Sequence, residues 1–217
     1  MKIAIILIII AYALLLIEKH LRNIKNGKYI ELGIYIIMII MVVIYLGGYR
    51  PTANWASRAN SFVNHEDELL EVSSQNGVYF HTYHQNEENQ YLTTVTERGL
   101  LGYYSRVSQY QHENKNVPID TITFLNYRND DNELLHYIML KKIDDKVKSI
   151  LIDSHEPIVL EFDENNEINV ILENVHDHTN VDILALDAQD ESIYYYGYPK
   201  GSNHISADDF KWHKIRP

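Results

Sequence analysis

The chain has 217 residues, no cysteine and a formal net charge of −11. The lack of cysteine excludes disulfides and thiolate chemistry. Residues 1–58 carry seven Lys or Arg against two Glu, a net of +5, whereas residues 59–217 carry twelve basic against twenty-eight acidic residues, a net of −16. An acidic region repels phosphate backbones, so no nucleic-acid partner is expected; solubility explains the acidity, and a cationic partner is the alternative.

Two runs near the N-terminus, residues 3–17 and 32–49, contain no charged residue. The second run would extend about 27 Å as a helix, close to the hydrocarbon thickness of about 30 Å. The first is shorter, about 22 Å, and spans if Lys2 and Lys19 extend to the two interfaces. The runs predict two transmembrane helices, at about residues 2–19 and 30–49. A cleaved signal peptide is the alternative for the first run, but "LLLIEKHLR" has no small-x-small site.

Basic residues gather between the two apolar runs, at Lys19, Arg22, Lys25 and Lys28. Because loops rich in Lys and Arg stay in the cytoplasm, this interval predicts the cytoplasmic turn of a helical hairpin, with both termini outside the cell membrane. These four residues would thus set the topology of a multi-pass protein. Binding of lipid headgroups without any effect on topology is the alternative.

The outer part begins after a juxtamembrane linker at residues 50–59. The spacing of Phe62, Val63, Leu69 and Leu70 predicts a helix over residues 60–75. Beyond it, short segments rich in β-branched and aromatic residues alternate with Asn- and Asp-rich turns, which predicts an antiparallel sandwich or barrel-like domain. The expected strands are residues 78–83, 91–95, 100–106, 121–127, 134–141, 147–153, 158–162, 168–172, 181–187 and 192–198.

The C-terminal tail, "SADDFKWHKIRP", predicts a short helix capped by Ser206 and Asp209. The fold class is therefore a membrane α-helical hairpin plus a mainly antiparallel β extracytoplasmic domain with a short N-terminal helix. The expected domains are a transmembrane hairpin at 1–49, the linker at 50–59 and the β-rich domain at 60–217.

Residues 121–197 resemble the β-meander of uncharacterised membrane-anchored extracytoplasmic proteins of Bacillus-type bacteria. The matching features are "VKSILID", "VDILALD" and the aspartate-turn-isoleucine of "DAQDESI". The resemblance implies a β module at the cell surface. It transfers no activity, cofactor or site residue.

One motif fits metal binding. In "NVHDHTN", His176 and His178 stand two apart, so on a strand both imidazoles would face one side and bind a metal with a third ligand. No third ligand is identifiable, and a solvated turn is the alternative we favour. "DENNEI" at 163–168 fails as a calcium loop, because Ile168 occupies the position that needs glycine. No cofactor and no metal are expected.

Seventeen tyrosines, many of them in predicted strands, favour cross-strand pairing; stacking on a glycan or peptide is the alternative. Neither a phosphate loop nor a catalytic motif is found, and Asp144 and Asp145 lie in a polar turn.

The expected function is that of a two-span cell-membrane protein of a Gram-positive-type bacterium, which displays an acidic β-rich module for binding. Its partners would be the lipid bilayer and an extracytoplasmic protein, peptide or glycan. An enzyme is not expected. The alternatives are an immunity or accessory factor against a secreted peptide and, less favoured, an enzyme acting on the cell envelope.

Overall fold

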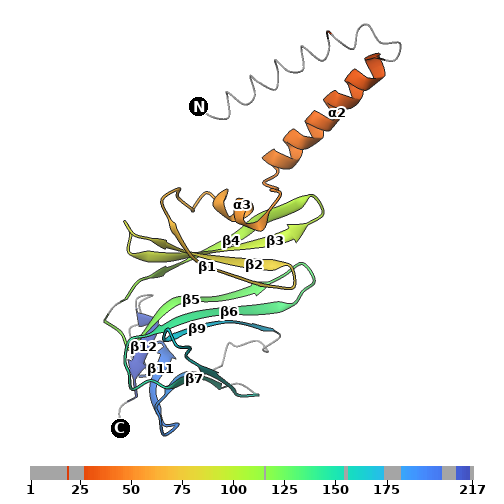
Figure 1. The fold of residues 1–217 in the computed structure, drawn as a ribbon. Coiled ribbons are helices and arrows are strands. Elements are labelled where there is room, and N and C mark those ends of the chain that lie inside the picture. The colour runs from red at the N-terminus through yellow and green to blue at the C-terminus, as the bar shows by residue number, and fades with distance from the viewer. Residues whose placement is uncertain are drawn as a thin grey trace. The chain divides into compact units, whose positions relative to one another are not determined.

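The computed structural model (Figure 1) describes residue 19 and residues 27–114, 116–153, 156–173, 182–201 and 209–215. The chain divides into two compact units, Met1–Arg50 and Pro51–Pro217. The first unit contributes helix α2, and the second contributes helix α3 and three β-sheets.

Helix α2 (Gly27–Leu46) ends in a Schellman motif rather than at the predicted residue 49. Gly48 adopts a φ of +84°, which suits glycine, and its N–H donates to the Tyr45 carbonyl oxygen at 3.1 Å. The N–H of Tyr49 reaches back to the Ile44 carbonyl oxygen at 3.2 Å. These two bonds satisfy carbonyl groups that the last turn leaves open, so the helix stops at Leu46.

The predicted transmembrane hairpin is wrong. Within the ranges that the structure describes, no helix is both long enough and apolar enough to cross a membrane. The reason lies at both ends of α2: Lys28 and Glu31 stand in its first turns, and Gly48 ends it. The uncharged helical stretch is residues 32–46, about 22 Å against about 30 Å of hydrocarbon.

The assignment as a multi-pass cell-membrane protein with both termini outside is corrected for the same reason. The first apolar run, residues 3–17, lies outside the described residues.

Sheet 1 is an antiparallel meander in the order β1-β2-β3-β4. Its strands are β1 (Glu68–Gln75), β2 (Val78–Gln85), β3 (Gln90–Gly99) and β4 (Gly102–His112).

The helix predicted over residues 60–75 is wrong, because β1 occupies its second half. Asn76 and Gly77 both have positive φ, as the two-residue turn of a tight hairpin requires, and they join β1 to β2. Pairing with β2 therefore decides the conformation of residues 68–75. A β-bulge between Leu69 and Glu71 accommodates the neighbouring apolar residues Leu69 and Leu70, whose spacing suggested a helix.

Helix α3 (Ala53–Arg58) lies in the segment predicted as a linker, and it covers part of sheet 1. Thr52 caps it by accepting a hydrogen bond from the Trp55 N–H at 3.2 Å. The Ser57 hydroxyl, fully buried, is 2.6 Å from the Tyr83 hydroxyl and 2.7 Å from that of Thr94. His81 lies on the same face of β2 as Tyr83 and is also buried. We call Ser57, His81, Tyr83 and Thr94 the α3 seat.

Sheet 2 has the order β5-β6-β9, and sheet 3 has the order β12-β11-β10-β7-β8, with every pairing antiparallel. The strands of sheet 2 are β5 (Ile119–Arg128), β6 (Leu134–Lys142) and β9 (Glu167–Glu173). Those of sheet 3 are β7 (Ser149–Asp153), β8 (Ile158–Glu161), β10 (Asp182–Leu186), β11 (Ser192–Gly197) and β12 (Lys211–Lys214).

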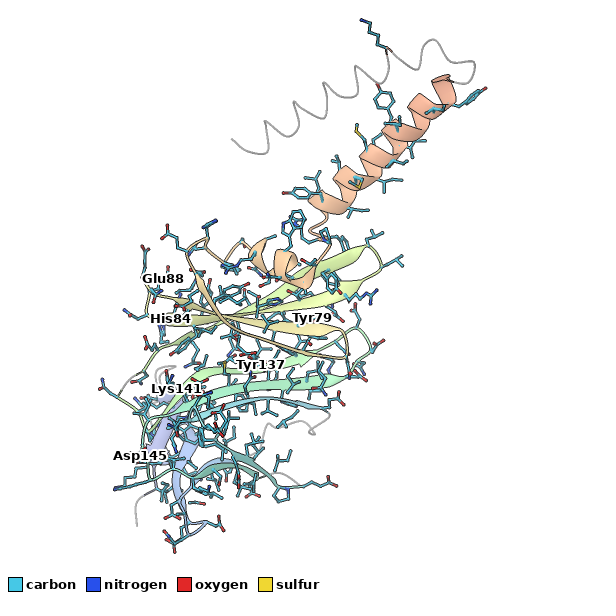
Figure 2. All side chains as sticks on the ribbon, viewed as in Figure 1. Tyr79, His84, Glu88, Tyr137, Lys141 and Asp145 are labelled. Atoms are coloured by element: carbon cyan, nitrogen blue, oxygen red, sulfur yellow. The ribbon has the colours of Figure 1, made fainter. Side chains whose placement is uncertain are left out.

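Sheet 2 is the middle of three layers, with a hydrophobic core on each face (Figure 1). Tyr137 of β6 points toward sheet 1, where its ring stacks on that of Phe80 with centroids 4.8 Å apart (Figure 2). Ile138, the next residue, packs into the second core with Ile150 and Trp212 of sheet 3. Burial on both faces explains why β6 reads as a nearly continuous apolar run instead of an alternating one.

All ten predicted strand segments overlap strands of the structure, which is mainly antiparallel β as expected for the region beyond the linker. The predicted tail helix is wrong: residues 211–214 form β12, which pairs with β11. Of the two predicted caps, Asp209 precedes this strand, and Ser206 lies outside the described residues. Burial of Trp212 in the second core, together with the pairing to β11, overrides the local helical pattern.

Candidate ligand-binding cavity

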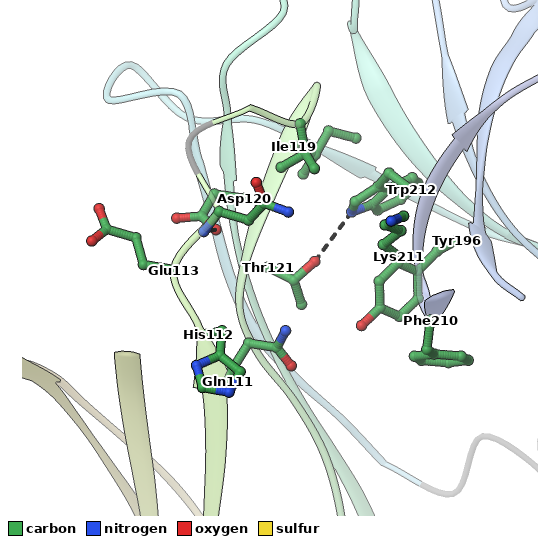
Figure 3. Close-up of a pocket in the computed structure, with 12 residues that line it drawn as sticks. Gln111, His112, Glu113, Ile119, Asp120, Thr121, Tyr196, Phe210, Lys211 and Trp212 are labelled. Carbon is green, nitrogen blue, oxygen red and sulfur yellow. Dashed lines mark hydrogen bonds between the residues drawn. The ribbon is translucent and has the colours of Figure 1, made fainter. Parts of the chain in front are cut away.

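A cavity of about 340 Å³ lies where the end of β4, the start of β5 and the strands β11 and β12 meet. Its volume is in the range of small-molecule sites, roughly 300–1,000 Å³. Figure 3 shows two chemically different sides. Aromatic residues line the side formed by β11 and β12, whereas acidic and amide residues line the side formed by the β4–β5 segment. We call these the aromatic wall and the acidic wall.

The aromatic wall consists of Tyr196, Phe210 and Trp212. The Tyr196 ring contacts Phe210 edge-on at 4.8 Å and Trp212 at 5.2 Å between centroids. The Trp212 indole N–H donates to the Thr121 hydroxyl at 3.1 Å (Figure 3), so the indole is held against β5. Burial raises the pKa of Tyr196 to about 12, so its phenol stays neutral at physiological pH. The wall is therefore an ordered apolar surface.

The acidic wall contains Asp120 and Glu113, which come from β5 and from the segment before it. Asp120 is only 4% exposed. The Tyr91 hydroxyl donates to one oxygen of Asp120 at 2.8 Å, and the Asn114 N–H donates to the other at 3.2 Å. Burial raises the pKa of the Asp120 carboxyl; the two hydrogen bonds oppose the shift, and the nearby Glu113 carboxylate adds to it.

Asp120 has no basic side chain in ion-pair contact among the residues described. Lys141, which lowers its pKa slightly, forms an ion pair of 3.0 Å with Glu167 instead. Glu113 lies 3.4 Å from the His84 imidazole, whose ring contacts that of Tyr91 at 5.3 Å. The acidic wall thus places a buried carboxylate beside the cavity without a cation against it.

A second cavity, of about 490 Å³, lies between residues 64–67 and 85–88. The residues along its lining are all polar, and none of them is Phe, Tyr or Trp. Its buried carboxylate, Asp67, accepts hydrogen bonds from the Asn64 N–H at 2.7 Å and from the Gln85 amide at 2.6 Å, which close the neighbouring loop. These contacts give Asp67 a structural role.

The predicted metal-binding pair, His176 and His178, lies outside the described residues. Across the described part of the chain, no group of three or more His, Cys, Asp or Glu is placed to hold a metal ion. The segment "DENNEI" forms a tight polar turn, in which the Asp163 carboxylate accepts hydrogen bonds from the N–H groups of Asn165 and Glu167. The turn is not a hairpin, because it connects β8 of sheet 3 to β9 of sheet 2.

The four residues predicted to set the topology are not brought together by the described structure. Lys19 is exposed, Lys28 lies in α2, and Arg22 and Lys25 lie outside the described residues. Of the tyrosines, Tyr196 lines the cavity, Tyr194 donates to Asp144 at 2.7 Å, and Tyr195 stacks on His213.

Sequence reasoning did not single out the residues of the cavity. One usable signal was Asp120, an acidic residue inside the β-branched run "IDTITF". The other was "KWHK", whose alternation fits a strand with Trp212 facing inward. No local sequence pattern predicts that the two walls lie next to each other, because their approach depends on the order of the strands in sheet 3.

The fold and cavity together define an antiparallel β domain of three layers with an amphipathic cavity at one end of its sheets. Comparison with models of protein families, with curated proteins and with solved structures finds no match. The resemblance to extracytoplasmic proteins of Bacillus-type bacteria therefore stays a prediction.

Proposed function

We propose that this protein is a binding module, and that its ligand occupies the cavity between the aromatic and acidic walls. The observation that carries the proposal is the pairing of an ordered apolar surface with a buried carboxylate across one space. Ligand sites in proteins combine apolar lining with a few placed polar groups in this way.

The scaffold around the cavity supports recognition. Both walls stand on or beside paired strands, and hydrogen bonds fix Trp212 to Thr121 and Asp120 to Tyr91. A site held in its bound geometry loses little conformational entropy when a ligand enters. The cavity therefore needs no large rearrangement to bind.

Trp212 provides a direct test, because the chain has two tryptophans and the other, Trp55, is 53% exposed on α3. In full-length protein carrying Trp55→Phe, the tryptophan fluorescence, excited selectively over that of the tyrosines, comes from Trp212 alone. We expect at least one compound class among alkylammonium ions, neutral sugars and N-acetyl amino-acid amides to change the Trp212 emission saturably.

A matched pair of substitutions checks the location. Phe210→Ala removes an aromatic group from the wall and should weaken the binding of the active compound, whereas Phe62→Ala, a similarly exposed ring that contacts Tyr110 instead, should not. A flat emission signal and no heat in calorimetry for every class at millimolar concentration would refute the proposal.

A further inference from the structure

We infer that the ligand of this cavity is the basic side chain of a peptide, with its cationic group at Asp120 and Glu113 and its hydrocarbon stem along the aromatic wall. The inference rests on the proposed function and adds the chemical class of the ligand.

The acidic wall supplies the first argument. Asp120 is 4% exposed and has hydrogen bonds from Tyr91 and Asn114, yet no ion pair among the described residues. A buried carboxylate is costly unless a positive charge compensates it. Glu113, which lies 3.4 Å from the His84 imidazole, adds a second carboxyl group on the same wall, and the exposed Lys211 of β12 lines the opposite side. A ligand cation would relieve the repulsion between the two carboxylates.

The aromatic wall supplies the second argument. The Tyr196 ring contacts those of Phe210 and Trp212, and the three side chains line the cavity. Lysine and arginine side chains bury their methylene stems on such surfaces, and their charged groups are attracted to aromatic faces. A neutral polar ligand would leave Asp120 without compensation, and a purely apolar ligand would desolvate it further.

The charge of the chain favours a peptide over a free amine. Residues 59–217 carry a net charge of −16, so their field attracts a polycationic chain more strongly than a single ammonium ion. Basic residues beside the bound one would remain outside the cavity and contribute through this long-range attraction, which salt screens.

The test uses the full-length Trp55→Phe protein and three probes at low salt. The probes are a pentapeptide with three lysines and two glycines, its analogue with norleucine in place of the three lysines, and n-butylammonium. We expect the lysine peptide to bind at least about tenfold more tightly than the norleucine peptide and n-butylammonium, and added salt to weaken it. If the norleucine peptide binds as tightly as the lysine peptide, the ligand is not a cation and the inference is wrong. If n-butylammonium binds as tightly as the lysine peptide, the ligand is not a peptide and the inference is wrong.

Variants locate the charge. Asp120→Asn and, separately, Glu113→Gln should each weaken binding of the lysine peptide, Asp120→Asn by about tenfold or more. The matched control is Asp131→Asn, which removes one exposed acidic group in the turn at the opposite end of β5 from Asp120 and should leave the affinity within about twofold. Thermal unfolding of each variant establishes that it is folded. Unchanged affinity in both cavity variants would overturn the inference.

The outcomes separate the two proposals. If neutral sugars or amides change the Trp212 emission while the lysine peptide does not, the binding module stands and the cationic ligand is wrong. If no probe of any class binds, both are wrong.

Discussion

The α3 seat and the cavity are two places where this protein buries polar groups, and they treat those groups differently. In the α3 seat, the hydroxyls of Ser57, Tyr83 and Thr94 satisfy one another within 2.7 Å, and α3 covers them. In the cavity, Asp120 is also buried but lies beside open space, and it forms no ion pair with any residue that the structure describes. The three hydroxyls of the α3 seat therefore hold α3 on sheet 1, whereas Asp120 leaves a negative group beside a space that a ligand can enter. The seat is not fully satisfied either, since the buried Nδ1 of His81 has no hydrogen-bond partner among the described residues.

The largest expected effect concerns His81 of the α3 seat. Burial, together with the smaller effect of the nearby Arg58 charge, lowers the pKa of His81 from 6.5 to about 4. Between about pH 6.5 and pH 4, His81 is therefore protonated in the unfolded chain but neutral in the folded chain. Stability falls as the pH drops through this window, by up to about 3 kcal/mol from this residue.

Urea unfolding at pH 7 and at pH 4 measures this effect. The His81→Gln variant should lose about 3 kcal/mol less than the wild type between these two pH values. His65→Gln, which removes an exposed histidine, is the control and should behave as the wild type does. The same acid sensitivity in His81→Gln and in the wild type would show that His81 does not resist protonation.

A smaller effect is expected for Ser57→Ala. The substitution leaves the buried hydroxyls of Tyr83 and Thr94 without their shared partner, which costs about 1–3 kcal/mol of unfolding free energy. Ser61→Ala, at an exposed position shortly after α3, should change stability by less than about 0.5 kcal/mol. Equal values for the two variants would mean that the α3 seat adds no specific stability.

The smallest effect, with the opposite sign, is expected for Asp120→Asn at neutral pH. Because the pKa of this carboxyl is raised in the folded state, its ionisation opposes folding as the pH rises above the usual value of 3.8. Removing the charge should leave the unfolding free energy unchanged or raise it by up to about 1 kcal/mol. A loss as large as that of Ser57→Ala would make Asp120 a structural residue like those of the α3 seat.

Local pattern was sufficient for part of the fold. Alternation of β-branched and aromatic residues located ten strands, and the Asp163 turn followed from its side-chain chemistry. The dipeptide Asn76–Gly77 also carried a hairpin signal that predicts β1, but the helical spacing of Leu69 and Leu70 concealed it. The prediction placed the end of α2 too late, because it considered the apolar character of the run and not the helix-ending effect of Gly48.

The remainder depended on contacts between residues far apart in sequence. β6 pairs with β9, and β7 pairs with β10, so neither sheet 2 nor sheet 3 follows chain order. The cavity joins residues 111–121 to residues 196–212. Their approach is decided by sheet order and by the seating of Trp212 on Thr121, which no local pattern encodes.

The middle position of β6 changes what holds that strand in register. In most sheets, a slip by one residue moves the apolar side chains into water, and this penalty fixes the alignment. β6 has a hydrophobic core on each face, with Leu135, Tyr137 and Met139 in the first core and Ile138 and Leu140 in the second. A slip by one residue would move these apolar side chains from one core to the other and not into water. Directional bonds, such as the 2.7 Å contact between His136 and Asn126 on the neighbouring strand, then contribute to the alignment.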